Sequence, residues 1–322
     1  MNYKQLAHWG LSLLSAGVKA ERDMGLPVHL TVEPTNICNL RCPVCETGAG
    51  ILRRPKGHMS LDTFKRTLDS VGEQVNTLLF YYMGEPFLNR DAYDMIKYAT
   101  GKGIYVSACT NGEILDTSGL ARSGLSELSF QIGGLTQETH EQYRVGGHMD
   151  KVMDNLAKAV ELKAKGLIKT KIQVGFIVMK HNEHEIARVE KELEEGMGAD
   201  EVIIIAPCVR TMEQGEKFMP TADKYWFYNR EAFSRGVLVP RKIPHNRCWW
   251  IYSSTVVCWD GNVVPCCRDA QGEHVMGNIL NQPFADIWNG EKYRDFRRQI
   301  ATKQSEVDLC RLCSGYGISR LY

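Results

Sequence analysis

Three cysteines lie within eight residues near the amino terminus of this chain: Cys38, Cys42 and Cys45. A disulfide requires particular Cα separations and Cβ directions, so three thiols on one short segment cannot easily cross-link one another. Thiolates are instead good ligands for soft metals and iron–sulfur clusters. Because a cubane cluster has four irons, three cysteines leave one iron open to a small-molecule ligand. A structural zinc site is the alternative, but it needs a fourth ligand nearby, and the next cysteine is Cys109.

The spacing Cys-x3-Cys-x2-Cys directly after a predicted strand resembles the signature of radical S-adenosylmethionine (SAM) enzymes. The resemblance implies a 4Fe–4S cluster whose open iron is chelated by the amino and carboxylate groups of SAM. The reduced cluster of such enzymes cleaves SAM to a 5′-deoxyadenosyl radical, which takes a hydrogen atom from the substrate. One difference is Val44, because the residue before the third cysteine is usually aromatic in the family. We expect this change to affect packing around the cluster more than its ligation.

Length and composition describe an ordinary globular chain. It has 322 residues, of which 43% are hydrophobic and 24% charged, and this length allows one large domain or two of usual size. The formal net charge of +1 gives no reason to expect a nucleic acid or an anionic membrane as the main partner. No segment is apolar for long enough to span a bilayer.

Eleven cysteines would suggest disulfides in a small secreted protein. Here they gather at metal-ligand spacings and no secretory signal peptide precedes them, so we expect a reducing, cytoplasmic compartment. Residues 3–20 predict a mildly amphipathic helix with Leu6, Trp9, Leu13 and Leu14 on its apolar side. Contact with a membrane or a partner is one interpretation of this helix. Packing over the first strand is the interpretation that we prefer.

Strand-like and helix-like segments alternate from residue 28 to residue 209. This alternation is typical of an α/β fold with βαβ units and a parallel sheet, and six units match the partial, six-stranded (β/α) barrel that the resemblance implies. In parallel βα folds the chemistry lies at the carboxyl ends of the strands, and the three cysteines follow the first strand. The predicted strands are Val28–Val32, Thr77–Tyr82, Ile104–Cys109, Glu127–Gln131, Ile172–Val178 and Val202–Ala206, and the predicted helices are Leu61–Val71, Arg90–Thr100, Asp116–Ser123, Asp150–Lys165 and Glu183–Glu195.

The segment after the second predicted strand is Tyr82-Met83-Gly84-Glu85-Pro86. Gly84 allows a tight turn of the backbone, and Pro86 restricts Glu85 to an extended conformation. An ordinary βα turn would explain these residues by themselves. Their position after the cysteines resembles the GEP motif of the family, whose backbone carbonyls accept hydrogen bonds from the SAM ammonium. Tyr82, Gly84, Glu85 and Pro86 are therefore predicted to contact SAM.

The third and fourth predicted strands also end in polar residues. Thr110 and Asn111 stand in a Thr-Asn-Gly segment similar to one found near the SAM ribose in relatives. After the fourth strand, relatives usually carry Ser-x-Asp-Gly, where this chain has Gln131 and Gly133. Gln131 is still able to hydrogen-bond a hydroxyl, while Gly133 removes a carboxylate that often faces the substrate. The substrate pocket is therefore expected to differ from that of most relatives.

Further contacts with SAM are predicted from the resemblance. Arg144 offers a planar fork suited to a carboxylate, and relatives use an arginine here for the SAM carboxylate; a solvated surface arginine is the alternative. The segment Val174–Val178 resembles the glycine-containing strand that accommodates adenine, and Lys180 and Asn182 follow it. The strand Val202–Ala206 is expected to pass its backbone beside the adenine ring.

A second set of cysteines comprises Cys248, Cys266, Cys310 and Cys313. An alternating segment with an Asp-Gly turn predicts a β-hairpin before Cys266, and residues 284–298 predict an amphipathic helix before Cys310. This arrangement resembles the twitch domain, the short form of the SPASM domain of radical SAM enzymes, and implies one auxiliary 4Fe–4S cluster held by these four cysteines. No cysteine follows Cys313, so a second auxiliary cluster is not expected. A zinc knuckle is the alternative for the last pair.

Prolines and a basic pair between residues 240 and 244 indicate a domain boundary. The predicted domains are an amino-terminal helix (1–25), a radical SAM partial βα barrel (26–210), a connector (211–244) and a small α+β auxiliary-cluster domain of the SPASM/twitch type (245–322). The connector is expected to contain one helix around Ala222–Phe233.

Four cysteines remain: Cys109, Cys208, Cys258 and Cys267. Free cysteines are often small buried hydrophobic residues. The alternative is that Cys109 or Cys208, at strand ends that face the expected active site, donates a hydrogen atom to a substrate radical, as a radical epimerase requires. Cys267 directly follows Cys266 and is able to alternate with it as a ligand.

Three classes of function follow from these residues. The first is oxidation, dehydration or decarboxylation of a small polar substrate (a sugar, cyclitol or nucleoside), as in the similar 2-deoxy-scyllo-inosamine dehydrogenase. There the auxiliary cluster accepts an electron while a base takes the hydroxyl proton. The second is maturation of a peptide or protein, or epimerisation through a cysteine hydrogen donor. The third is a metal-binding protein without turnover, against which the intact cysteines and the GEP segment argue.

The predicted catalytic residues are Cys208, Arg210 and Asp269, with His245 and Arg268 as further candidates for the base. The predicted cofactors are two 4Fe–4S clusters and SAM. The predicted partners are a small-molecule substrate and an electron donor of the flavodoxin or ferredoxin type. Neither a nucleic acid nor a transmembrane segment is expected.

Overall fold

The computed structural model describes residues 1–242 and 245–313. These residues form two compact units, each built from more than one stretch of the chain. The first unit holds Met1–Ile37, Arg53–Val106 and, from the carboxyl-terminal part, residues 245–313; the second holds Cys38–Leu52 and Ser107–Lys242. The ends of the predicted connector and auxiliary-cluster domain, residues 243–244 and 314–322, lie outside the described residues.

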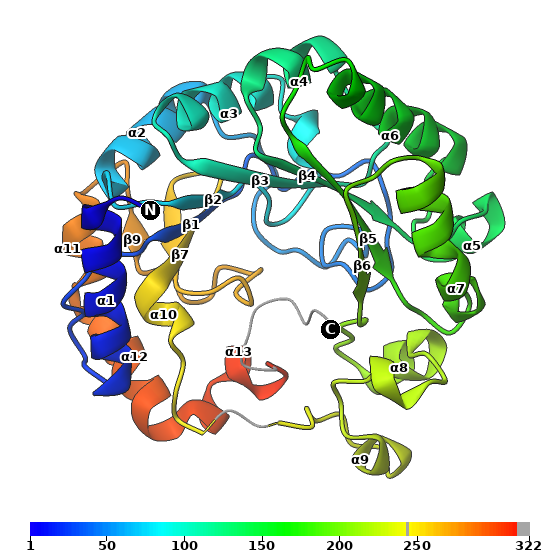
Figure 1. The fold of residues 1–322 in the computed structure, drawn as a ribbon. Helices are drawn as coiled ribbons and strands as arrows, with labels where there is room; N and C mark the ends of the chain where they lie inside the picture. Colours follow the sequence, from blue (N-terminus) through cyan, green and yellow to red (C-terminus); the bar gives the residue numbers. More distant parts are fainter. Residues whose placement is uncertain (243–244, 314–322) are drawn as a thin grey trace. The chain divides into compact units, whose positions relative to one another are not determined.

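The first unit contains a mixed sheet (Figure 1). Strand β1 (His29–Val32) pairs in parallel with β2 (Thr77–Leu79) on one side and with β7 (Ser254–Val257) on the other. Strand β8 (Asn262–Val264) runs antiparallel to β7, and β9 (Gly277–Asn278) runs antiparallel to β8. Strands β7 and β8 form the hairpin that the alternating pattern and the Asp-Gly turn predict.

The second unit contains a parallel sheet. Strand β3 (Tyr105–Thr110, in this unit from Ser107 onward) pairs with β4 (Glu127–Ile132), β4 with β5 (Lys171–Ile177), and β5 with β6 (Glu201–Ile205). Side chains alternate between the two faces of such strands. On one face the apolar side chains of β4 and β5 are fully buried, and Figure 1 draws helices α4 and α6 along the same strands. The alternation of strands and helices confirms the predicted α/β fold.

Helices follow the strands largely where the periodicity predicts them, and side chains mark several of their starts. Ser60 accepts a hydrogen bond from the Thr63 N–H at the start of α2, and Asp116 accepts one from the Ser118 N–H at the start of α4, as is usual for these residue types. The helices are α1 (Tyr3–Gly17), α2 (Leu61–Val71), α3 (Ala92–Gly101), α4 (Thr117–Ser123), α5 (Gln137–Glu141), α6 (Met149–Ala164), α7 (Ile186–Glu190), α8 (Met212–Phe218), α9 (Arg230–Ser234), α10 (Trp250–Ser253), α11 (Phe284–Trp288), α12 (Glu291–Lys303) and α13 (Asp308–Arg311). Single 3-10 turns are η1 (Pro86–Leu88), η2 (Glu183–Glu185), η4 (Asp223–Tyr225) and η5 (Gln304–Glu306), and η3 (Lys191–Gly196) is a π-helix that continues α7.

Two predicted helices are interrupted. The connector has α8 where no helix was expected, and the predicted helix around 222–233 is reduced to one turn and the five-residue α9. Asn229 ends the extended stretch between them, because its side chain accepts a hydrogen bond from the Ala232 N–H and caps α9. The predicted helix 284–298 divides into α11 and α12 at Asn289, whose side chain is hydrogen-bonded to Asp23 in the same unit.

Helix α1 buries the opposite face from the one that its sequence pattern suggests. The apolar side chains of Leu6, Trp9, Leu13 and Leu14 are between 39% and 54% exposed, so the expected apolar contact with the first strand is wrong. The buried residues of this helix are polar: Gln5, Ser12 and Ser15. Gln5 Nε2 donates to the Val75 carbonyl and Ser12 Oγ donates to Asp23, so hydrogen bonds decide which face is covered.

A buried ion pair joins Glu33 and Arg54, which lie on either side of the sequence segment that carries the first three cysteines. Arg54 donates to both carboxylate oxygens of Glu33 at 2.9 and 2.6 Å, and the two side chains are only 10% and 0% exposed. Arg54 Nε also donates to the Ala270 carbonyl, and the Trp259 N–H donates to Glu33. Burial alone would lower the pKa of Arg54, but its hydrogen bonds to Glu33 outweigh that effect and hold the pKa above its usual value.

Replacement of Arg54 by Met is expected to destabilise the protein strongly. It would leave the Glu33 carboxylate buried without its charge partner, at a cost of about 3–5 kcal/mol in the free energy of unfolding. Urea denaturation under anaerobic conditions, followed by circular dichroism, measures this loss. The control is Lys158→Met, which removes an exposed pair with Asp154 and should change stability by less than about 0.5 kcal/mol. A similar small change for Arg54→Met would contradict the prediction.

Candidate functional site

The three cysteines Cys38, Cys42 and Cys45 lie on an irregular loop of the second unit. Cys38 Sγ accepts hydrogen bonds from the Leu40 N–H at 3.4 Å and from Asn111 Nδ2 at 3.8 Å. Burial raises the pKa of the Cys45 thiol, although backbone N–H groups that follow it work in the opposite direction. Nitrogen donors aimed at sulfur stabilise thiolates and tune iron–sulfur clusters. The donor set therefore fits a cluster held by three thiolates.

Arg144 lies beside this loop and is half-buried. Its Nη1 is 3.7 Å from Cys42 Sγ, and its guanidinium stacks on the Tyr143 ring at 5.3 Å. Burial alone would lower the pKa of Arg144, but the negative charge at Cys42 outweighs it and raises that pKa. Arg144 Nε is buried without a hydrogen-bond partner in the described part of the chain. This orphaned donor fits the predicted contact with the SAM carboxylate, which stays a prediction.

Arg210 and Gln214 hold the same cysteine loop from a distant part of the sequence. Arg210 Nη1 donates to the Val44 carbonyl at 2.7 Å, and its Nη2 pairs with Glu46 at 2.5 Å. Gln214 Nε2 donates to the Pro43 carbonyl at 3.4 Å. Arg210 was predicted as a catalytic residue, and these contacts give it a positioning role that the sequence did not reveal. No local pattern marks Gln214.

The GEP segment packs against the residues before the first cysteine. Gly84 has a φ of +80°, and a Cβ there would lie 2.5 Å from the Thr35 carbonyl oxygen and 2.7 Å from that of Ile37. The Glu85 N–H donates to the Ile37 carbonyl at 2.9 Å. Only glycine permits this approach, so within the first unit the segment is tied to the residues that precede Cys38 in the sequence. The predicted contacts of Tyr82, Gly84, Glu85 and Pro86 with SAM stay predictions.

Asn111 reaches the cysteine loop, whereas Thr110 closes its own turn. Asn111 Nδ2 donates to Asn39 Oδ1 at 2.8 Å in addition to its contact with Cys38. Thr110 Oγ1 accepts from the Gly112 N–H at 3.0 Å. The structure thus brings the Thr-Asn-Gly segment to the first cysteine. A contact with the SAM ribose is still a prediction for both residues.

The two residues predicted after β5 differ in exposure. Asn182 is fully buried: its Nδ2 donates to the Gly133 and Ile177 carbonyls, and its Oδ1 accepts from the Met179 N–H. These bonds use the side chain to join two strand ends of the second unit. Lys180 is exposed. Contacts of Lys180 and Asn182 with SAM remain predictions.

The second set of cysteines gathers in the first unit. The pKa of Cys248 is raised by burial, and negative charge at Cys313 adds to this effect; burial also raises the pKa of Cys310 to about 12, with Cys248 contributing. Each of these thiols thus lies within electrostatic range of another cysteine of the set. In residues 1–242 and 245–313, however, no three His, Cys, Asp or Glu side chains converge as they would around a single metal ion.

Asp269 organises the turn that follows Cys266 and Cys267. Its Oδ1 accepts from the Glu273 N–H and its Oδ2 from the His274 N–H, both at 2.9 Å, and the residue is 1% exposed. The pKa of Cys267 is lowered to about 7 by a hydrogen bond from the Cys266 side chain. Asp269 was predicted as a catalytic residue. Its carboxylate supports the loop beside two neighbouring cysteines, and a catalytic role stays a prediction.

The remaining cysteines have different surroundings. Cys258 is 1% exposed and packs with Val256 and Val264, which agrees with a small hydrophobic residue. Cys208 Sγ accepts a hydrogen bond from the Tyr228 hydroxyl at 3.8 Å. Cys109 Sγ lies 4.0 Å from the Gln131 side-chain nitrogen. The hydrogen-donor role of Cys208 is not tested by these contacts.

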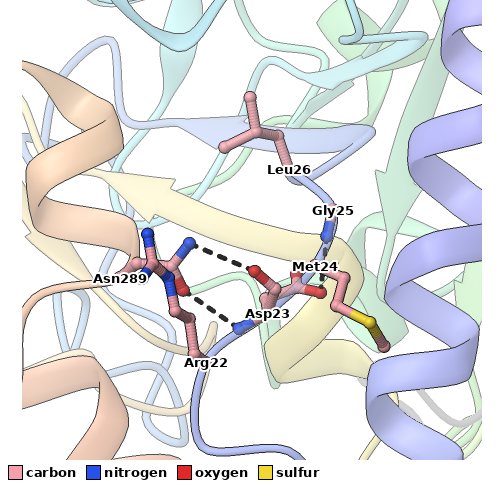
Figure 2. A pocket seen from close by; sticks show the side chains of 6 residues that line it. All are labelled: Arg22, Asp23, Met24, Gly25, Leu26 and Asn289. Carbon is pink, nitrogen blue, oxygen red and sulfur yellow. Dashed lines mark hydrogen bonds between the residues drawn. The ribbon is translucent and has the colours of Figure 1, made fainter.

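A pocket of about 540 Å³ lies in the first unit, lined by Arg22–Leu26 and Asn289 (Figure 2). None of the predicted site residues lines it. Its polar groups pair with one another: Asn289 Oδ1 accepts from the Asp23 N–H at 3.0 Å, and Asn289 Nδ2 donates to the Asp23 carbonyl at 3.2 Å. The pocket is therefore separate from the predicted chemistry.

Comparison with protein families agrees with the geometry of the cysteine loop. Residues 32–193 match the Radical SAM superfamily, and residues 248–314 match SPASM, an iron-sulfur cluster-binding domain. The chain belongs to the radical SAM superfamily. The predicted resemblance, the partial βα barrel fold with a SPASM-type domain, and the cofactors SAM and 4Fe–4S iron–sulfur clusters are thereby confirmed. Among helices of the described residues, none has the length and apolar character needed to cross a membrane.

Curated relatives of known activity align with most of the chain. The AdoMet-dependent heme synthase of Methanosarcina barkeri is 26% identical, with 90% of each chain covered. The mycofactocin maturase MftC of Mycobacterium ulcerans is 26% identical, covering 93% of this chain and 84% of the relative. The PqqA peptide cyclase of Ruegeria pomeroyi is 24% identical, covering 88% and 79%. The names of these similar proteins thus refer to different substrates.

Two solved structures share the fold. BtrN in complex with AdoMet and 2-DOIA is 17% identical and has a TM-score of 0.55, covering 88% of this chain and 92% of that chain. SuiB of Streptococcus suis bound to S-adenosylmethionine is 15% identical and has a TM-score of 0.67, covering 90% and 72%. At these identities the similarity establishes the fold and not the substrate.

Acid is expected to destabilise the second unit through His140. Burial, together with the nearby Arg144, lowers the pKa of this histidine from 6.5 to about 4, and its Nδ1 accepts from the Gly133 N–H. Below pH 6.5 His140 binds a proton in the unfolded chain but not in the folded one. The free energy of unfolding therefore falls as the pH falls toward 4. Between pH 7 and pH 5.5 this group should remove about 1 kcal/mol of the free energy of unfolding.

Urea denaturation at both pH values, on wild type and His140→Gln, measures this contribution. The variant should lose about 1 kcal/mol less than wild type over the same interval. Equal losses in both proteins would show that His140 is not the group responsible.

Arg210→Met should weaken the cysteine loop. The substitution removes the bonds to Val44 and Glu46, and a loop with less support should lose its cluster more readily. We expect iron retained after gel filtration to fall toward the content of the auxiliary site alone. Arg188→Met, which breaks an exposed pair with Glu192, is the matched control. Equal iron retention in the two variants would contradict the positioning role.

Proposed function

We propose that this enzyme oxidises a small hydroxyl-bearing substrate, such as a sugar, cyclitol or nucleoside. Cys38, Cys42 and Cys45 would hold the SAM-binding cluster, and Cys248, Cys266, Cys310 and Cys313 one auxiliary cluster. When bound, the first cluster and SAM supply a hydrogen-abstracting radical, and the auxiliary cluster supplies an electron acceptor. The substrate carbinol would lose one hydrogen atom, one proton and one electron, leaving a ketone. Dehydration and decarboxylation are variants of the same radical chemistry.

The observation that carries this proposal is the polar face of the parallel sheet in the second unit. Along β3 to β6, many side chains on this face carry amide, hydroxyl, thiol or carboxylate groups: Ser107, Cys109, Glu127, Ser129, Gln131, Gln173 and Glu201. The isoleucines toward the ends of β5 and β6, Ile177, Ile203 and Ile205, are its apolar members. Strands of a purely structural parallel sheet are apolar on both faces. A face that offers hydrogen bonds suits a ligand rich in hydroxyl groups. In parallel βα folds ligands bind at the carboxyl ends of the strands, and Cys109 and Gln131, each next to last in its strand, lie at that end of the face.

Four cysteine ligands support the role of the auxiliary cluster as an electron acceptor. With all irons bound to protein, no iron is left open for a substrate. Cys208, Arg210 and Asp269 remain the proposed catalytic residues, in addition to the positioning contacts of Arg210 and Asp269. The proposal also includes an electron donor of the flavodoxin or ferredoxin type. It includes a cytoplasmic location as well, which is supported by the eleven cysteines, none of which is in a disulfide.

Peptide modification is the second candidate function. It is favoured by the names of two similar proteins, a mycofactocin maturase and a PqqA peptide cyclase. Among solved structures, SuiB has also been seen bound to the precursor peptide SuiA. A peptide substrate would place a backbone or side-chain carbon of an amino acid residue at the abstracted position. Deuterium transfer from labelled substrates into 5′-deoxyadenosine separates the two candidates.

The triple variant Cys38→Ala/Cys42→Ala/Cys45→Ala should lose SAM cleavage completely while it keeps the auxiliary site. After anaerobic reconstitution, wild type should hold about eight irons per chain and the variant about four, because each cubane has four. Iron and sulfide analysis with EPR spectroscopy measures both values. Formation of 5′-deoxyadenosine by the triple variant would overturn the radical SAM mechanism.

Wild type with about four irons and one zinc would mean that the carboxyl-terminal cysteines are structural. The proposal of an electron-accepting auxiliary cluster would then fall, and a redox-neutral radical reaction would replace it. Cys258→Ala is a control for loss of a thiol, because Cys258 is a buried core residue. Its iron content should equal that of wild type.

A further inference from the structure

A single chain of hydrogen bonds crosses the polar face of β4, β5 and β6 in the second unit. Gln131 Nε2 donates to Ser129 Oγ at 2.8 Å, and Ser129 Oγ donates to Gln173 Oε1 at 3.0 Å. Gln173 Nε2 then donates to Glu201 Oε2 at 2.6 Å. Ser129 and Gln173 are 2% and 3% exposed, so the middle of the chain is shielded from water.

The hydrogen-bond chain has one direction because Glu201, its last member, has no hydrogen to donate. An ionised carboxylate only accepts hydrogen bonds, and Lys171 Nζ, at 2.5 Å, places a positive charge beside Glu201. Gln173 must therefore turn its NH₂ group toward Glu201 and its oxygen toward Ser129. The Ser129 hydroxyl then donates to Gln173 and accepts from Gln131. Amide orientation follows from such a network and not from the shape of the side chain.

The hydrogen-bond chain ends at Gln131, whose side-chain carbonyl oxygen is its open acceptor. One Nε2 hydrogen goes to Ser129 and the other points to Cys109 Sγ at 4.0 Å, so both donors are used. Among the described residues, Gln131 Oε1 accepts no hydrogen bond. Turning the amide over would set this oxygen against Ser129, whose own hydrogen is already committed to Gln173. The network thus holds Gln131 as an acceptor.

The neighbouring strand makes room for this amide. Gly175 lies opposite Gln131 in the register of β4 and β5, and a Cβ at Gly175 would lie 2.5 Å from Nε2 and 2.6 Å from Oε1 of Gln131. No side chain other than glycine fits there without moving the amide. Gln131 is half-buried, so its carbonyl oxygen is accessible from the polar face.

We infer that Glu201, Gln173 and Ser129 are positioning residues that fix Gln131 as a hydrogen-bond acceptor for a hydroxyl group of a bound ligand. The inference rests on the proposed function and deepens it by assigning a specificity determinant. The hydroxyl has two possible sources, the ribose of SAM or the small substrate. In either case a ligand without that hydrogen is disfavoured, because the acceptor oxygen is then left unpaired.

Glu201→Gln tests the inference, with Glu127→Gln as its matched control. A glutamine at 201 is able to offer either an oxygen or an NH₂ group to Gln173, so the chain loses its fixed direction. Glu127 lies on the same face and accepts a hydrogen bond from Ser107, but it is not part of the chain that ends on Gln131. Ser129→Ala, which interrupts the chain in its middle, is a second variant in case Glu201→Gln folds poorly.

The first measurement is the anaerobic dissociation constant of SAM, 2′-deoxy-SAM and 3′-deoxy-SAM for reconstituted wild type and variants. If the ribose is the source, wild type should bind one deoxy analogue about tenfold more weakly than SAM, as expected for one lost hydrogen bond. Glu201→Gln and Ser129→Ala should reduce this preference to about threefold or less. Glu127→Gln should keep the full preference.

The second measurement uses SAM-loaded protein with 2-deoxy-scyllo-inosamine and its mono-O-methyl ethers as probes. If the substrate is the source of the hydroxyl, the deoxy analogues of SAM should bind as tightly as SAM. One methyl ether should then bind to wild type more weakly than the parent cyclitol does, and this difference should be lost in Glu201→Gln and Ser129→Ala, in which the hydrogen-bond chain is disrupted. Equal preferences in wild type and Glu201→Gln for both probe sets would overturn the inference, as would an equal effect of Glu127→Gln. Failure of wild type to bind SAM at all would instead refute the proposed function, and the inference with it.

Discussion

Negative charge gathered on one short loop is the constraint on which the second unit depends. Cys38, Cys42 and Cys45 bind a cluster as thiolates, and Glu46 follows directly. Buried anions are stable only beside cations or hydrogen-bond donors. The unit brings these groups from far along the chain: Arg144 to Cys42, Arg210 to Glu46 and Asn111 to Cys38. The helices and strands that carry them are therefore arranged around the loop, which has little regular structure itself.

The sheet of the second unit meets a different demand on each face. Apolar residues such as Phe130 and Val174 are fully buried on one face and supply the hydrophobic free energy of the fold. The other face bears groups that need hydrogen bonds, and the structure satisfies them along the chain from Gln131 to Glu201. A buried network of polar side chains costs free energy when its hydrogen bonds are only partly formed, and it is rigid when they are formed. Here, in the described part of the chain, one acceptor is left over, the Gln131 carbonyl oxygen at the end of the hydrogen-bond chain.

In the first unit, backbone contacts connect the GEP segment to the approach to the cysteines, and an ion pair supports that approach. Gly84 allows the segment to lie against Thr35 and Ile37. Glu33, two residues before Thr35, is held by Arg54, and the same carboxylate accepts the N–H of Trp259 from the carboxyl-terminal hairpin. One buried carboxylate thus joins β1 to the domain that carries the second set of cysteines. Loss of its charge partner would affect both, because a buried unpaired charge is costly wherever it lies.

The family, the alternation of strands and helices and the hairpin before Cys266 were predictable from local sequence patterns, and the same patterns predict the two sets of cysteine ligands. These depend on spacing and on periods of two or 3.6 residues, which are local properties. The sequence by itself did not determine which face of α1 is buried, because hydrogen bonds of Gln5 and Ser12 to residues elsewhere in the chain outweigh the apolar pattern. The partners of Arg210 and the direction of the Gln131–Glu201 chain were also decided only by the tertiary structure. Arg210 lies 166 residues from Val44, and at such distances only the assembled fold says which groups meet.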